Sequence, residues 1–175
     1  AESPPVLSVS VAAIAGLRML ALPRVSPRFG ALLWLGQGSW NLLAEVGMGV
    51  PETFSGGPTA DSAVDVHPLL EGLVGGCFSH QWPVARLAGC LEVEVGWWQL
   101  RGLNVSAPKS GSSALIALGP SVRALFPIGE RFALFTGGGF RPVLMRPRAN
   151  FVGYGTALES GPLLVSFEMG LGARW

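Results

Sequence analysis

The sequence predicts an all-β protein, an eight-stranded antiparallel up-and-down transmembrane β-barrel that forms one domain over residues 1–175. Charged residues make up only 13% of the chain and the mean hydropathy is +0.45, which is typical of a membrane protein or a very buried one. No apolar run reaches the roughly 20 residues of a transmembrane helix, because Arg18 interrupts the best candidate at residues 6–22. Shorter segments alternate apolar with polar or small residues, as barrel strands do.

Turn-like stretches divide the chain into candidate strands. In order, these strands are residues 7–19, 28–36, 40–50, 66–78, 86–100, 113–126, 132–145 and 163–175. The connections 36–39, 79–84 and 127–130 are short, whereas 51–65, 102–112 and 146–162 are longer and polar, and 20–27 is intermediate. Short turns at one end and longer loops at the other are typical of transmembrane barrels. An even strand count places both termini at the short-turn end, which makes residues 1–6 a short N-terminal periplasmic segment.

The third and the fifth to eighth segments each separate an uncharged face from a face with charges and small residues. The second segment is the weakest prediction, since both of its faces are apolar. In a soluble sandwich or lipocalin-like barrel, the apolar face would point inward and the charged face would meet water. The polar face is rich in Gly, Ala and Ser, and Lys109 is the single lysine, which favours a crowded interior.

The charged positions predict a network of ion pairs in the lumen. In strand order they are Arg18, Glu45, Glu71, Glu92, Glu94, Arg123, Arg141 and Glu168. An eight-stranded barrel is only wide enough for side chains, and unpaired buried charges are very costly. We therefore expect Arg123 near Glu92, with Arg18 and Arg141 flanking Glu168. Glutamates on neighbouring strands also permit a second interpretation, a narrow pore or an ion or proton pathway.

Two clusters of aromatic residues predict the girdles found at membrane interfaces. Their tryptophans are Trp34, Trp40, Trp82 and Trp175 near the short-turn ends, and Trp97 and Trp98 near the long-loop ends.

The cysteines predict a disulfide. Cys77 and Cys90 lie symmetrically about residues 83 and 84, so a turn centred there makes them cross-strand neighbours on the lumen side. The alternative is two small buried thiols.

The last segment ends in alternating apolar residues and an aromatic one: Phe167, Met169, Leu171 and Trp175. This ending resembles the C-terminal signal of outer-membrane barrels, and the resemblance implies insertion by the barrel assembly machinery. Residues 77–175 also resemble small outer-membrane β-barrel proteins of the myxobacterial kind. The resemblance lies in the Cys77/Cys90 hairpin and in residues 90–96, 118–123 and 140–147. In size and strand count, the chain is similar to the OmpA/OmpX group.

These resemblances imply a location in the outer membrane of a Gram-negative bacterium, among lipopolysaccharide and other outer-membrane proteins. The start of the sequence looks like a mature N-terminus after removal of a signal peptide. The net charge of +1 gives no indication of nucleic-acid binding. We expect no metal, no cofactor and no catalytic set, because Ser79 and His80 share a short turn with no acid nearby. A structural or accessory envelope subunit is the favoured function, ahead of a pore and of an enzyme acting on lipid.

Overall fold

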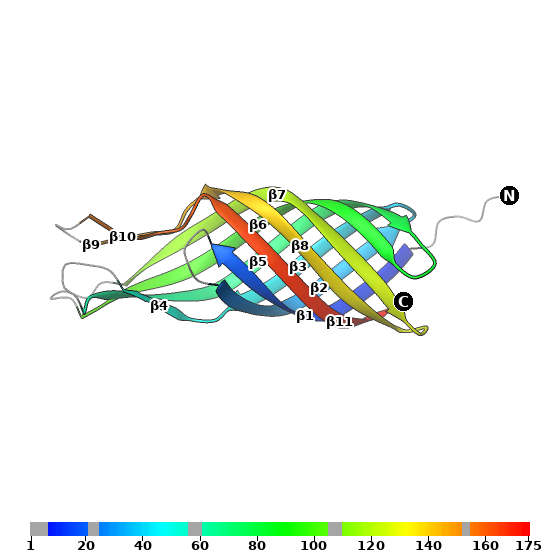
Figure 1. Ribbon diagram of the computed structural model, residues 1–175, viewed down its shortest axis with the longest axis horizontal. Coiled ribbons are helices and arrows are strands. Elements are labelled where there is room, and N and C mark those ends of the chain that lie inside the picture. Colours follow the sequence, from blue (N-terminus) through cyan, green and yellow to red (C-terminus); the bar gives the residue numbers. More distant parts are fainter. Residues whose placement is uncertain (1–6, 21–24, 56–60, 105–109, 152–154) are drawn as a thin grey trace.

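The structure is a computed structural model that describes residues 7–20, 25–55, 61–104, 110–151 and 155–175. These residues form β-strands joined by turns (Figure 1). The strands are β1 (Leu7–Leu20), β2 (Val25–Gln37), β3 (Trp40–Gly49), β4 (Glu52–Ser55), β5 (Ala63–Gln81), β6 (Arg86–Leu103), β7 (Ser110–Ile128), β8 (Phe132–Met145), β9 (Arg148–Phe151), β10 (Gly155–Glu159) and β11 (Leu163–Arg174). Within the described part of the chain, no helix is long and apolar enough to cross a membrane. The predicted segment at residues 1–6 lies outside the described residues.

The long strands close into one antiparallel ring. Its order is β1, β2, β3, β5, β6, β7, β8 and β11, and β11 pairs with β1. The pairing of β3 with β5 places Gly47 opposite Glu71, and the pairing of β1 with β11 places Ser10 opposite Arg174. The predicted eight-stranded antiparallel barrel is therefore confirmed.

At one end of the barrel, neighbouring strands are joined by short turns. Gly38 and Gly129 have φ values of 62° and 69°, a backbone conformation that glycine adopts without steric cost. At the opposite end, β5, β6 and β7 extend beyond the ring together with β4, β9 and β10 (Figure 1). We call these projecting segments the outer extension. In known transmembrane barrels, the short turns lie at the periplasmic end.

The connections at residues 51–65 and 146–162 were predicted as loops, and this was wrong in part. The first contains β4, which pairs with the outer part of β5, and the second contains β9 and β10, which pair with each other. Cross-strand hydrogen bonding keeps these polar segments extended although they lack apolar alternation. β2 likewise begins at Val25, three residues before its predicted start.

The wall of the barrel is apolar outside and polar inside. Along β6, Leu91 and Trp97 are 60% and 51% exposed, whereas Glu92 and Glu94 between them are fully buried. Exposed Val, Leu, Phe and Met side chains continue this apolar surface around the other strands. A soluble barrel would show the opposite arrangement, so the wall requires a surrounding bilayer.

Two apolar clusters fill the lumen, and the charged residues lie between them. The inner cluster, toward the short turns, includes Trp34, Leu43, Cys77 and Phe135, and the outer cluster includes Trp98. Along β6 the order is Cys90, then the two buried glutamates, then Trp98, so the strand crosses all three layers.

Candidate functional site

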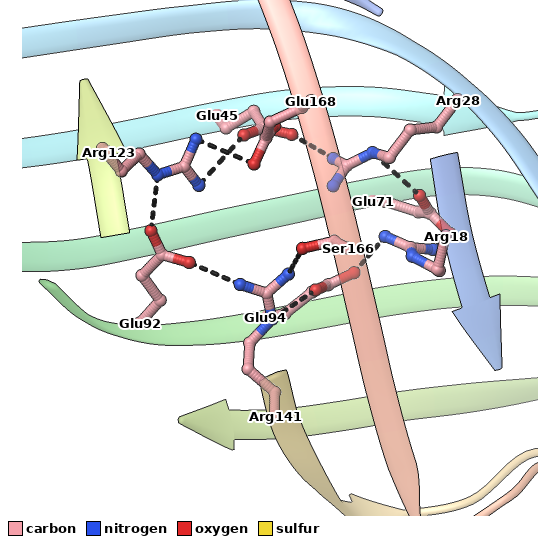
Figure 2. A network of polar contacts seen from close by, with 10 residues as sticks. All are labelled: Arg18, Arg28, Glu45, Glu71, Glu92, Glu94, Arg123, Arg141, Ser166 and Glu168. Atoms are coloured by element: carbon pink, nitrogen blue, oxygen red, sulfur yellow. Dashed lines mark hydrogen bonds and ion pairs between the residues drawn. The ribbon is translucent and has the colours of Figure 1, made fainter. Parts of the chain in front are cut away.

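Nine buried charged side chains meet in the middle of the lumen (Figure 2). Each points inward because alternate residues of a strand face the same side of the sheet. Every barrel strand contributes at least one, and none is more than 5% exposed. In strand order they are Arg18, Arg28, Glu45, Glu71, Glu92, Glu94, Arg123, Arg141 and Glu168.

Arg123 and Arg141 share the carboxylate of Glu92. Arg123 Nε lies 2.7 Å from Oε1 of Glu92, and Arg141 Nη1 lies 2.5 Å from Oε2. Arg141 Nε is also 3.0 Å from Oε2 of Glu94, and its Nη2 donates a hydrogen bond of 2.5 Å to the hydroxyl of Ser166. Charge-assisted hydrogen bonds of this kind are stronger than neutral ones.

The other arginines complete a closed circuit of ion pairs. Arg18 pairs with Glu71 and Glu94, and Arg28 pairs with Glu45 and lies 3.8 Å from Glu71, measured from Nε to Oε2. Arg123 Nη2 closes the circuit at 3.7 Å from Oε2 of Glu45. In order, the circuit is Arg28, Glu45, Arg123, Glu92, Arg141, Glu94, Arg18, Glu71 and back to Arg28. We call it the charge ring.

Within the charge ring, each charge has an opposite charge on both sides. Four guanidinium groups alternate with four carboxylates, so the ring itself is balanced. The ninth group, Glu168, lies beside the ring, with its Oε1 2.8 Å from Nη1 of Arg123. The balance offsets the high cost of burying ions.

The structure places Arg123 beside Glu92, but the expected pairing of Glu168 with Arg18 and Arg141 was wrong. Arg18 pairs with Glu71 and Glu94, and Arg123 is the partner of Glu168. Strand order alone does not show how far each long side chain reaches across the lumen. Arg28 was missed because both faces of its segment are apolar, so alternation could not orient it. The excess of predicted glutamates over arginines was the signal that another inward cation was needed.

Glycines make room for the arginines of the ring. A Cβ at Gly119 would clash with the main-chain oxygen of Phe140 and would lie 2.8 Å from Cα of Arg141. A Cβ at Gly137 would lie 3.2 Å from Cδ of Arg123. These inward glycines therefore set the space that the guanidinium side chains fill.

Side chains leave little space in the described part of the lumen. Near Arg18, Arg28 and Glu71, a cavity of about 20 Å³ opens toward the outer end, which is room for about one water molecule. Among the residues that the structure describes, no group of three or more His, Cys, Asp or Glu could hold a metal ion. The arrangement gives every buried charge an opposite partner and fills space.

The predicted disulfide is present in the inner layer. Cys77 and Cys90 lie directly opposite each other on β5 and β6, with a Cα–Cα distance of 4.0 Å. Both are buried.

Most predicted interface aromatics lie on the outer wall, but Trp34 does not. Trp40, Trp82, Trp97 and Trp175 are 44% to 73% exposed. Trp34 is 1% exposed and donates a hydrogen bond of 2.9 Å to Oδ1 of Asn41 in the lumen, so the prediction for it was wrong. Trp98 also faces inward. Position near a strand end does not determine which side of the wall a residue faces.

The predicted assembly signal contains three apolar residues that lie on the outer wall. They are Phe167, Met169 and Leu171.

The described charges of the outer extension are of mixed sign and mostly paired. Glu159 lies 2.9 Å from Arg148 and 3.6 Å from Arg146. Asp65 is hydrogen-bonded to His67 and Thr53 at 2.8 Å and 2.9 Å, and these contacts lower the pKa of its carboxyl.

Comparison with known proteins identifies the fold. No protein-family model matches the chain, and no curated protein matches it. A major outer membrane protein from Thermus thermophilus is similar, with a TM-score of 0.65 at 11% identity over 97% of this chain and 99% of that one. Ail, the attachment invasion locus protein of Yersinia pestis, solved in complex with the heparin analogue sucrose octasulfate, gives 0.59 at 12% identity over 99% and 100%.

This protein has the fold of eight-stranded outer-membrane barrels. Together with the apolar wall, that fold makes it an integral membrane barrel.

Proposed function

We propose that this outer-membrane barrel is a closed structural or accessory subunit of the envelope, and that it works within a larger outer-membrane assembly. The observation that carries the proposal is the charge ring, which crosses the lumen and uses side chains from all but one of the barrel strands. Apolar clusters fill the lumen on both sides of it.

Conduction would require a continuous wet path past these layers. The ring supplies no free carboxylate, because each of its glutamates lies between two arginines. An ion entering the ring would have to separate buried pairs, which costs several kcal/mol for each pair that loses one partner. The filled lumen therefore favours a structural role over a pore.

Single-channel recording in planar bilayers tests the closed lumen. We expect no current above leak from protein whose folded state has been checked by its gel mobility before and after boiling. Discrete openings would overturn the proposal and favour the alternative, a narrow cation or proton pathway along the glutamates. In that case, Glu92→Gln should change the cation selectivity of the openings, since Glu92 lies in the ring.

The assembly role has a separate test. Outer membranes are solubilised in a mild detergent, with and without prior chemical cross-linking, and the size of the particle that carries the protein is measured. We expect a particle clearly larger than the 18.3 kDa chain in its detergent micelle. Migration as a monomer under both conditions would contradict an accessory role.

The outer extension gives no support to binding of a polyanion such as the heparin analogue in the Ail structure. Its described arginines Arg146 and Arg148 are paired with Glu159, and Arg101 lies opposite Asp65 in the β5–β6 ladder. We propose contact with lipopolysaccharide and neighbouring proteins instead.

We also propose that the protein is exported with a cleaved signal peptide and inserted by the barrel assembly machinery. The residues Phe167, Met169, Leu171 and Trp175 would be the signal that this machinery recognises.

A further inference from the structure

The lipid-facing wall contains a groove of about 480 Å³ across β1, β2, β3, β5 and β6. Small residues, Ala31, Ala44 and Gly72, lie at its floor. Larger side chains such as Leu33 and Val74 form its sides, and both are exposed. The outward side chains that line it carry no hydrogen-bonding group.

The strand register explains why the groove forms here. Ala31 lies opposite Val46, and Val46 lies opposite Gly72 on the next strand, so small and branched residues alternate along one row. Several outward positions on the opposite side of the barrel are bulkier. On β7, β8 and β11 they include Phe126, Phe140, Phe167 and Met169, all of them exposed. The groove therefore lies on the side of the barrel formed by β1, β2, β3, β5 and β6.

We propose that this groove holds one acyl chain of a phospholipid from the periplasmic leaflet. Neighbouring strands lie about 4.8 Å apart, so a groove across five strands is roughly 19 Å long. The length and the apolar lining of the groove thus match a single extended hydrocarbon chain.

The shape of the groove argues against a second barrel as its occupant. Two convex barrel walls touch along a line, and contact of that kind leaves a hollow unfilled, whereas stable protein interfaces bury about 800 Å² on each partner.

The position of the groove along the barrel indicates which leaflet supplies the acyl chain. Val11 and Leu33, at its β1–β2 end, lie within four residues of the paired Leu7 and Gln37, at the short-turn end of the barrel. A chain anchored in the periplasmic leaflet, which consists of phospholipid, can enter there.

Gly72→Val is the decisive variant. A Cβ at Gly72 meets only the main-chain oxygen of Glu45, at 3.9 Å, so a valine fits the strand and fills the groove. Gly89→Val is the matched control, because Gly89 lies on the same wall outside the groove and a Cβ there meets nothing within 4 Å. Each protein is extracted in mild detergent from vesicles of phosphatidylethanolamine and lipopolysaccharide and examined by native mass spectrometry.

We expect wild-type protein and Gly89→Val to retain one lipid of phospholipid mass, and Gly72→Val to retain it at least tenfold less often. Spin-labelled phosphatidylethanolamine in reconstituted vesicles gives a second measurement, in which only Gly72→Val should lose a slowly exchanging lipid component. Equal retention by all three proteins would overturn the proposal, as would wild-type protein without lipid. A retained adduct of lipopolysaccharide mass, or a dimer that Gly72→Val abolishes, would overturn it by assigning the groove to another occupant.

Discussion

Arg141 is the fully buried arginine that links Glu92 and Glu94 in the charge ring. Arg141→Met keeps most of the side-chain length but leaves each carboxylate with one partner fewer. Removing one member of a buried ion pair typically costs about 3–5 kcal/mol. We expect the free energy of unfolding to fall by about that amount, measured by urea unfolding in phospholipid vesicles.

Arg101→Met is the control for this variant, because Arg101 is exposed in the outer extension. Surface substitutions of this kind usually change stability by less than about 0.5 kcal/mol. If the two variants were equally stable, the charge ring would not contribute to stability as described.

Gly119 tests the space beneath the same arginine. Because a Cβ there would meet main-chain atoms of Phe140 and Arg141, the latter at 2.8 Å, Gly119→Ala forces β7 and β8 apart. Overpacking of this kind costs about 1–3 kcal/mol. We expect a lower urea midpoint and less protein with folded gel mobility, while Gly89→Ala, which meets nothing, should match the wild type. Equal behaviour of the two variants would show that the strands have room to spare.

At the scale of elements, the β5–β6 hairpin is cross-linked by Cys77 and Cys90, which are 13 residues apart in sequence. In the chain-entropy model, a closed loop of about 15 residues contributes about 3 kcal/mol. We expect reductant to lower the free energy of unfolding by at most about that amount. The Cys77→Ala/Cys90→Ala variant should not respond to reductant. Two free thiols in protein isolated without reductant, detected by mass spectrometry, would contradict the bond.

The strands that could be predicted from sequence are those whose charges mark the lumen side. β6 is the clearest, because Glu92 and Glu94 alternate with Leu91 and Val93. β2 lacked this contrast, and so Arg28 was missed and Trp34 was placed on the wrong side of the wall. The short strands of the outer extension depend on hydrogen bonding to a neighbour, which leaves no periodic trace in the sequence.

The ion pairs themselves could be predicted only in part. Strand alternation gave the membership of most of the network, and the cost of burial requires each charge to find a partner. Which arginine reaches which glutamate depends on side-chain length and on the glycines opposite, such as Gly119 and Gly137.

For the whole molecule, a wall that is apolar outside and polar inside predicts which tryptophans are in contact with lipid. Trp40 and Trp175 are more than two-thirds exposed on the outer wall, whereas Trp34 and Trp98 are buried in the lumen. In vesicles of brominated lipid, we expect Trp40→Phe to remove quenchable emission and Trp34→Phe to remove emission that the bromine atoms do not quench. A loss of quenchable emission from Trp34→Phe as large as that from Trp40→Phe would place Trp34 in the bilayer.

The pairing of β1 with β11, from Ser10–Arg174 to Leu20–Leu164, has a consequence for biogenesis. The ribosome makes β1 before every other strand of the barrel and β11 after them, so the barrel cannot close during translation. Until β11 arrives, both edge strands of the sheet are unpaired and the apolar outer face has no closed barrel behind it. A nonsense mutation upstream of β11 would leave these edge strands permanently unpaired, which would make the truncated product a substrate for proteases.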